Sequence, residues 1–281
     1  MPPSSRPLTA WELVWRRCAL RWEALRPCLE RSTGWKVWNP GLYGEPWHSR
    51  FCRLYAPAAR PFVLLGLNPG PYGMAQTGIP FTDIRRLVLA LPALAAELRD
   101  TGERLEVPGL APASLRPYLN RTFESSSVRV YRFLERSWGD AERAWRKVVV
   151  ANPCPLLFID KETGKNRTPA DLRPTLARLA GGRAKQNDLL ADFDRLRRLS
   201  AAEVLEVLRP RGAVLLGRDV ESSLGPLAIR ILGERRVLAW EHPARAVPNK
   251  WATGLLEALR RRGLASVGAD SRRPRLGSHR G

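Results

Sequence analysis

Three segments of this sequence place amide or imidazole side chains directly after a short apolar run. The first is LNPGPYGM, which carries Asn68, the second is NPCP, which begins with Asn152, and the third is EHPAR, which carries His242. Amide and imidazole groups form directional hydrogen bonds, and glycine lets the backbone approach a ligand closely. The first loop therefore suits a small, flat ligand. Each segment also has a structural interpretation, because asparagine is common in turns and a lone histidine is often a packed core residue.

The elements that must position these residues are four short apolar runs, at residues 62–66, 147–151, 213–217 and 236–240. Their apolar character is continuous rather than alternating, which is typical of strands buried on both faces of a sheet. The intervening segments have helical periodicity, so we predict an α/β fold in which a central, mainly parallel four-stranded sheet is flanked by helices. Ligands of such sheets bind beyond the carboxyl ends of the strands. The three segments are therefore expected to meet at one edge.

Helix signals fix several further elements. Thr9 followed by Glu12 forms a capping box and predicts a helix that runs toward Leu29. A second helix is expected to begin at Thr168-Pro169, and a third spans residues 189–208. Residues 90–130 are expected to form a helix and then an irregular loop. We expect one domain over residues 9–265, a flexible N-terminus over residues 1–8 and a disordered basic tail over residues 266–281.

The charge balance indicates a polyanionic partner. Lys and Arg number 47 against 27 acidic residues, which gives a net charge of +20 and a pI near 11.1. Nucleic acid is the first expectation, although arginine spread over a solvated surface is the alternative. No run of 18 apolar residues is present, so neither a membrane span nor a membrane partner is expected.

The four cysteines argue against a metal site. They form no CxxC pair and have no spacing typical of zinc, so no metal and no cofactor is expected. An iron–sulfur cluster held by irregularly spaced cysteines is a minor alternative. Reduced, at least partly buried thiols are the favoured interpretation.

The strings LLGLNPGPYGMAQTGIPF, NPCPLLF and HPARAVPNKW together resemble the uracil-DNA glycosylase superfamily, most closely its single-strand-selective monofunctional branch. That branch typically has GMNPGPFGMAQTGVPF in the first motif, so Leu67, Tyr72 and Ile79 are mild replacements. Weaker similarity extends from about Trp38 to Gly263. The third motif departs from the family pattern HPSPRNPQANKGW, because it is three residues shorter and has Ala244 in place of serine. In the resembling enzymes this segment wedges into a DNA duplex, so the shortening affects the expected geometry of the wedge and the expected preference for duplex DNA.

The resemblance implies a three-layer fold and a role for each motif residue. Asn68 would position the attacking water, and His242 would donate a hydrogen bond to uracil O2 as a neutral imidazole. Asn152 would accept from N3–H and donate to O4, a pattern that cytosine reverses. Phe81 would stack on the flipped base, whereas Gly70 and Met74 would line the C5 side of the pocket. The third motif supplies residues for phosphates or for the space left by the flipped nucleotide: Arg245, Asn249 and Lys250.

These roles imply a monofunctional glycosylase that flips out uracil, and also 5-hydroxymethyluracil, and hydrolyses it from single- or double-stranded DNA in base excision repair. No lysine occurs in the first two motifs, so no lyase step is expected. A non-catalytic nucleic-acid-binding protein and a xanthine- or hypoxanthine-excising glycosylase are the alternatives. A nucleotide-binding protein ranks last, because the loop lacks GxxxxGK[ST] and GxGxxG spacing. We expect a monomer, in the nucleoid or cytoplasm of a bacterium or in a eukaryotic nucleus.

Overall fold

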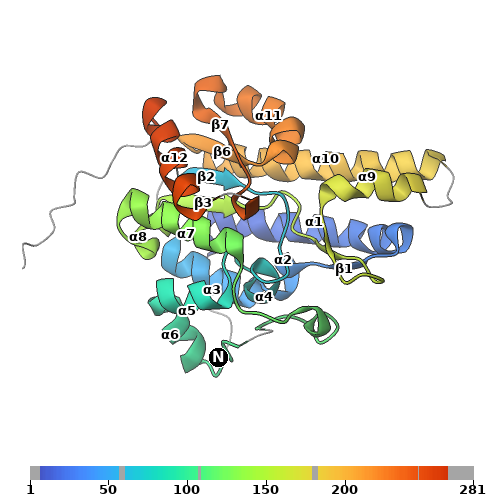
Figure 1. Cartoon of the computed structure of the whole chain (residues 1–281), viewed down its shortest axis with the longest axis horizontal. Coiled ribbons are helices and arrows are strands. Elements are labelled where there is room, and N and C mark those ends of the chain that lie inside the picture. Colours follow the sequence, from blue (N-terminus) through green and yellow to red (C-terminus); the bar gives the residue numbers. More distant parts are fainter. Residues whose placement is uncertain (1–6, 57–60, 107–108, 179–182, 246, 265–281) are drawn as a thin grey trace, which may run out of the picture.

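The central feature of the fold is a four-stranded parallel sheet with the strand order β3-β2-β6-β7 (Figure 1). The computed structural model describes residues 7–56, 61–106, 109–178, 183–245 and 247–264. Almost every side chain of the sheet is buried, as the continuous apolar runs predict. The α/β fold with a mainly parallel four-stranded sheet is thereby confirmed. Its strands are β2 (Phe62–Leu65), β3 (Val148–Ala151), β6 (Gly212–Leu216) and β7 (Val237–Trp240).

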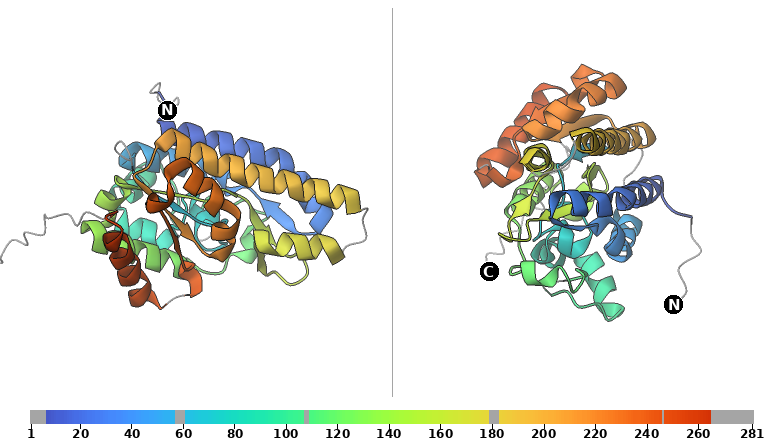
Figure 2. Two further views of the ribbon diagram at one scale, coloured as in Figure 1. Left: turned by 90° about the horizontal axis from the view of Figure 1, so that it is seen from above. Right: turned by 90° about the vertical axis from the view of Figure 1, so that its right-hand side faces the viewer.

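Helices cover both faces of this sheet. In the view of Figure 1, α10 and α11 lie above it, and α3, α7 and α8 lie below it. Figure 2 shows the two long helices α1 and α10 side by side. The α-helices are α1 (Ala10–Thr33), α2 (Pro40–Tyr43), α3 (Glu45–Tyr55), α4 (Met74–Thr77), α5 (Ile84–Ala90), α6 (Pro92–Asp100), α7 (Ser125–Trp138), α8 (Ala141–Trp145), α9 (Pro169–Arg178), α10 (Arg183–Leu208), α11 (Arg218–Leu232) and α12 (Pro248–Arg261). The short 3-10 turns are η1 (Arg116–Tyr118), η2 (Glu234–Arg236) and η3 (Pro243–Arg245).

The first helix begins at the predicted capping box. The Thr9 hydroxyl accepts a hydrogen bond from the Glu12 backbone N–H at 3.2 Å, and the Glu12 carboxylate accepts one from the Thr9 N–H at 2.8 Å. The helix continues four residues beyond the predicted Leu29 and ends at Thr33, where Gly34 takes a left-handed φ of 72°. Residues 1–6 and 265–281 lie outside the described residues, so the expected flexible N-terminus and basic tail are not tested, apart from residues 7 and 8.

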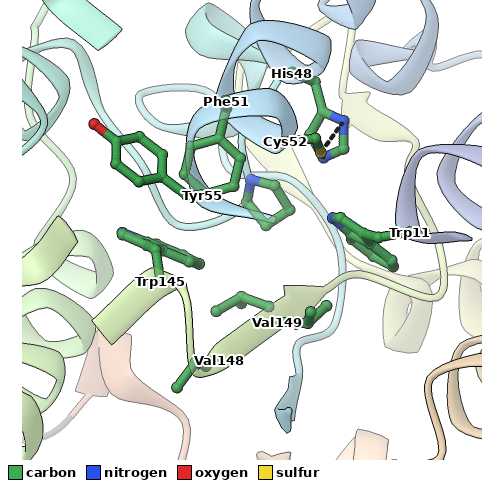
Figure 3. A pocket seen from close by; sticks show the side chains of 10 residues that line it. Trp11, His48, Phe51, Cys52, Tyr55, Trp145, Val148 and Val149 are labelled. Carbon is green, nitrogen blue, oxygen red and sulfur yellow. Dashed lines mark hydrogen bonds between the residues drawn. The ribbon is translucent and has the colours of Figure 1, made fainter. Parts of the chain in front are cut away.

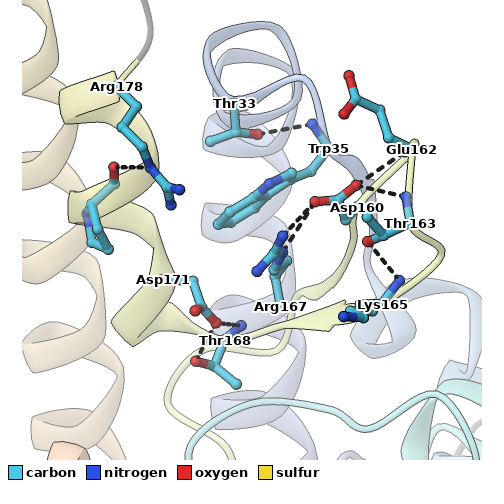
Figure 4. A network of polar contacts seen from close by, with 11 residues as sticks. Thr33, Trp35, Asp160, Glu162, Thr163, Lys165, Arg167, Thr168, Asp171 and Arg178 are labelled. Carbon is cyan, nitrogen blue, oxygen red and sulfur yellow. Dashed lines mark hydrogen bonds and ion pairs between the residues drawn. The ribbon is translucent and has the colours of Figure 1, made fainter.

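A second, antiparallel sheet of three short strands was not predicted. Its strands are β1 (Lys36–Trp38), β4 (Leu157–Ile159) and β5 (Asn166–Arg167), with β4 in the middle. The turn between β4 and β5 is held by Asp160, whose carboxylate accepts hydrogen bonds from the Arg167 guanidinium at 2.6 Å and from two backbone N–H groups of the turn (Figure 4). The bond from Arg167, together with those N–H groups, lowers the pKa of Asp160 to about 2. This hairpin leads directly into α9.

The core beneath the parallel sheet contains one of the histidines, His48, in an aromatic setting (Figure 3). Its ring stacks on Trp15 with 3.9 Å between ring centroids, and its Nδ1 lies 3.5 Å from the Cys52 sulfur. A cavity of only about 10 Å³ adjoins it, lined mainly by aromatic and valine side chains. Burial lowers the pKa of His48 to about 3. His48 is therefore a neutral packing residue in the core.

Candidate active site

A cleft of about 1160 Å³ opens at the carboxyl ends of the parallel strands. Its walls come from the segments that follow β2, β3, β6 and β7, together with the start of α7 and part of the β5–α9 connection. Asn68, Asn152 and His242 all line it. The predicted meeting of the three segments at one edge is therefore observed.

Asn68 lies half-buried in the loop that follows β2. Its Nδ2 donates to the backbone oxygen of Pro69 at 3.2 Å and to that of Leu156 at 3.5 Å. Both carbonyls lie on the amide-nitrogen side of the group, so the orientation of the side chain is fixed. The opposite atom, Oδ1, is the one available to accept a hydrogen bond from a water molecule in the cleft.

Asn152 presents a buried amide that is only partly satisfied. The residue is 4% exposed, and its Nδ2 lies 3.4 Å from the sulfur of Met74. Its Oδ1 has no hydrogen-bond partner in the part of the chain that the structure describes. An unpaired buried acceptor costs about 1–3 kcal/mol. A ligand that donates an N–H group to this oxygen would remove that cost.

Gly66 explains how the Asn152 amide comes so close to the sheet. A Cβ on Gly66 would lie 2.6 Å from Cε2 of Phe81 and closer still to Asn152 Oδ1. The Gly66 N–H meanwhile donates to the Ala151 backbone oxygen at 2.8 Å, so the β2–β3 pairing continues through the glycine. The missing side chain leaves the space in which the amide and the aromatic ring meet.

His242 is half-buried immediately after β7. Its Nδ1 accepts a hydrogen bond from the Ala244 backbone N–H at 3.2 Å. An accepting nitrogen carries no proton, so the proton of the neutral imidazole resides on Nε2. Gly217 lies against this residue with a left-handed φ of 100°, and a Cβ there would lie 3.2 Å from the His242 Cβ. The local backbone thus favours the tautomer of the neutral imidazole in which Nε2 is the hydrogen-bond donor.

Phe81 forms another wall of the cleft. It is 6% exposed, and its ring centroid lies 6.5 Å from that of His242. Its backbone has a φ of 52°, an uncommon value for a residue with a side chain. The Ser127 hydroxyl donates to the Phe81 carbonyl at 2.8 Å and holds this conformation in place. The ring is therefore set in one orientation beside the two asparagines and the histidine.

The family to which this chain belongs follows from its sequence. Residues 53–260 match the profile described as the Uracil DNA glycosylase superfamily. The chain belongs to this superfamily. Its resemblance to the single-strand-selective branch is also confirmed, because the chain is 30% identical over 241 residues to a single-strand selective monofunctional uracil-DNA glycosylase of Rattus norvegicus. That alignment covers 83% of this chain and 78% of the relative.

Two further matches agree with this membership. A single-strand selective monofunctional uracil DNA glycosylase of Bos taurus is 30% identical over 236 residues, which cover 81% of this chain and 78% of the relative. Among solved structures, wild-type SMUG2 of Pedobacter heparinus superposes with a TM-score of 0.56 at 20% identity, covering 81% of this chain and 88% of that structure. The structural match supports the superfamily fold.

The superfamily motifs do not bring every predicted residue to the cleft. Gly70 and Met74 line it, whereas Asn249 and Lys250 are exposed in the first turn of α12, outside its lining. The Asn249 Oδ1 accepts a hydrogen bond from Arg132 of α7 at 2.9 Å. The Arg245 side chain lies outside the described part of the structure. Contacts of these three residues with DNA remain predictions.

Glu124 also lies in this cleft, although no sequence pattern singled it out. Glu124 lines the cleft just before α7, and its carboxyl fills the positions that side chains on Gly70 and Gly73 would take. Burial, reinforced by the charge of Asp83, raises the pKa of Glu124 to about 7, against the lowering influence of neighbouring Ser126 and Arg121. A glutamate before a run of serines is typical of an exposed helix start, so its sequence context gave no signal.

No group of three or more His, Cys, Asp or Glu side chains is placed to hold an ion within the ranges given above. Three of the four cysteines are buried and Cys28 is half-buried, and burial raises the pKa of Cys18 to about 11. None of the helices in the described ranges has the length and apolar character needed to cross a membrane.

Proposed function

We propose that this protein is a monofunctional DNA glycosylase that hydrolyses uracil and 5-hydroxymethyluracil from DNA and leaves an abasic site. The observation that carries the proposal is the convergence of Asn68, Phe81, Asn152 and His242, from three separate motifs, on one cleft. Membership of the Uracil DNA glycosylase superfamily supports a glycosylase activity and DNA as the substrate. A net charge of +20 favours association with the DNA backbone.

The cleft suits a uracil base that has left the DNA stack. The unpaired Oδ1 of Asn152 accepts from N3–H, and its Nδ2 exchanges the Met74 sulfur for the stronger acceptor O4. Cytosine would present an acceptor at N3 and a donor at position 4, so neither atom of the amide would be paired correctly. Phe81 stacks on the face of the base, a contact worth about 1–3 kcal/mol. Recognition of the base therefore combines one amide with one ring.

Cleavage breaks the bond between C1′ and N1, and its electron pair leaves with the uracil. Negative charge then develops on O2, where the Nε2–H of His242 donates a hydrogen bond. The Ala244 N–H keeps the proton on Nε2 before the reaction starts, so the donor needs no rearrangement. One such preorganised donor contributes about 3–4 kcal/mol to transition-state stabilisation in comparable sites. His242 thus stabilises the leaving group.

Water completes the reaction at C1′ from the side of Asn68. The amide is a weak base, but the sugar already carries positive charge when the base departs, so orientation of the water suffices. Because Nδ2 of Asn68 donates to two backbone carbonyls, Oδ1 is the atom that accepts a hydrogen bond from this water. The bound water adds its hydroxyl to C1′ and its proton passes to solvent, from which the uracil anion takes up a proton; the products are an abasic site and free uracil. No lysine lines the cleft in the described ranges, which supports hydrolysis over a lyase step.

Excision from oligonucleotides with a single uracil, single-stranded or in a duplex, tests the proposal. We expect the wild type to yield abasic product, and His242→Ala and Asn68→Ala each to slow single-turnover excision by at least about 100-fold. Asn187→Ala serves as the matched control, because Asn187 is exposed on α10 away from the cleft and should leave the rate unchanged. Circular dichroism and thermal unfolding verify that each variant is folded.

Several results would contradict the proposal. Salt-sensitive DNA binding without any excision would favour a non-catalytic binding protein. Excision of xanthine or hypoxanthine but not uracil would refute the assigned base. Covalent trapping on uracil-containing DNA by borohydride would refute simple hydrolysis. Wild-type rates in both alanine variants would refute the roles of the two side chains.

A further inference from the structure

The contacts of Asn152 place the C5 edge of the bound base within the cleft, a placement that rests on the proposed function. In the uracil ring, C5 follows C4, whose O4 pairs with Asn152 Nδ2 in the proposed complex. The group that lies against this Nδ2 is the sulfur of Met74, 3.4 Å away. The C5 edge therefore faces the segment from Gly70 to Met74, on the far side of the amide from the O2 position assigned to His242.

Two glycines leave this wall of the cleft without side chains, and a carboxyl group occupies the vacated space. The Glu124 Oε1 stands where a Cβ on Gly70 would lie, and Oε2 stands where a Cβ on Gly73 would lie. The Glu124 Cδ is 3.0 Å from each of these two positions. Gly70 and Glu124 both line the cleft. The three atoms nearest to each of the two Cβ positions all belong to this carboxyl group, which therefore lies against the glycine backbone.

The same short stretch of chain holds both the carboxyl and the stacking ring. The Glu124 backbone N–H donates to Asp83 Oδ2 at 2.9 Å, and Ser127, one helical turn further on, donates to the Phe81 carbonyl at 2.8 Å. Gln76 Nε2 donates to the Arg121 carbonyl at 2.9 Å and ties the preceding residues to the glycine loop. Glu124 is thus fixed relative to the plane on which the base would stack.

We infer that Glu124 is the residue that discriminates between substituents on C5: its carboxyl forms a hydrogen bond with a C5-linked hydroxyl group and disfavours a bare methyl group. A 5-hydroxymethyl group can donate to a carboxylate and can also accept from a protonated carboxyl. The methyl group of thymine can do neither, and it would displace water from a charged or strongly polar group without replacing its hydrogen bonds. Uracil has only hydrogen at C5 and leaves room for water beside the carboxyl.

The test compares three bases in otherwise identical single-stranded oligonucleotides: uracil, 5-hydroxymethyluracil and thymine. Glu124→Leu removes the hydrogen-bonding group while keeping a side chain of similar size. We expect it to lower the ratio of kcat/KM for 5-hydroxymethyluracil over uracil by about tenfold or more, and to raise thymine excision relative to uracil. Glu124→Gln, which retains a donor and an acceptor, should restore most of the preference.

Glu221→Leu is the matched control, because Glu221 is an exposed glutamate on the α11 side of the same cleft. It should leave both ratios unchanged. Ratios in Glu124→Leu within about twofold of the wild-type values would overturn the inference while leaving the proposed function intact. The ratio between bases separates this effect from a general loss of folding or activity, which would lower all rates together.

Failure of the proposed function has a different signature, namely a folded wild-type protein that excises none of the three bases. The affinities of the free bases, measured by calorimetry for the wild type and Glu124→Leu, then test the inference directly. Tighter binding of 5-hydroxymethyluracil than of thymine in the wild type, and loss of that difference in the variant, would support it. Equal affinities in the wild type would refute it.

Discussion

Replacing Gly66 by alanine tests the geometry of the cleft without removing any functional group. The new methyl would lie 2.6 Å from Cε2 and 2.8 Å from Cζ of Phe81, and closer still to Asn152 Oδ1. Carbon atoms in ordinary contact are about 3.5 Å or more apart, so the ring and the amide would each have to retreat by about 1 Å. The substitution therefore moves together the Phe81 ring and the Asn152 amide, which the proposed function assigns to base stacking and base recognition.

The expected effect follows from that displacement. Misplacing a substrate-positioning group by about 1 Å lowers a rate by about 100-fold, and overpacking of a buried site costs about 1–3 kcal/mol of stability. Gly66 has no left-handed φ, so backbone strain contributes nothing. We expect Gly66→Ala to unfold at a lower temperature but to remain folded at 25 °C, with a kcat/KM for uracil excision lowered by about 100-fold.

Single-turnover excision of uracil from a fluorescent oligonucleotide, with thermal unfolding of the same samples, provides the measurement. Gly225→Ala is the matched control, because a Cβ at this position in α11 would meet only Leu215 Cδ1, at 3.7 Å. It should keep full activity and gain slightly in stability, since alanine favours a helix over glycine. Excision by Gly66→Ala within about threefold of wild type would refute the close packing of Asn152 and Phe81 around this glycine.

Two further predictions concern pH and stability. Burial lowers the pKa of His48 to about 3, so the stability that depends on its neutral form is complete above the unfolded pKa of 6.5 and is lost as the pH falls toward 3. His48→Phe should flatten the fall in urea-unfolding free energy between pH 7 and pH 5; an unchanged slope would refute this assignment. The Arg167 guanidinium, with backbone N–H groups, lowers the pKa of Asp160 to about 2, so its contribution is present above pH 3.8 and is lost as the pH falls through about 2. Asp160→Asn should lower the melting temperature modestly at pH 7 and not below pH 2, and equal losses at both pH values would contradict the ion pair.

The parallel sheet could be predicted because each strand is a continuous apolar run buried on both faces. The antiparallel sheet could not, because β1 and β4 have only three residues each and pair across about 120 positions of sequence. Three-residue segments such as Lys-Val-Trp and Leu-Phe-Ile occur throughout a globular chain. Their pairing is set by tertiary packing rather than by local pattern.

The site was predictable to the extent that its residues follow strands. Asn68, Asn152 and His242 each come directly after an apolar run, and parallel strands bring such positions to one edge. The position of Glu124 in the cleft escaped prediction because it depends on the absence of side chains at Gly70 and Gly73, about 50 residues earlier in the sequence. Its raised pKa comes from burial against the Gly70 loop, and no pattern around position 124 reveals that contact.

The left-handed backbone of Phe81 has a consequence for the catalytic cycle that the proposed function implies. A conformation of this kind costs about 1–3 kcal/mol, and here the Ser127 hydroxyl and the surrounding packing compensate for it. This free-energy cost is part of folding and is already met in the protein without a bound nucleotide. Under the proposed function, each incoming base would therefore meet a surface that is already ordered, and binding would not have to fix the conformation of this segment at each turnover.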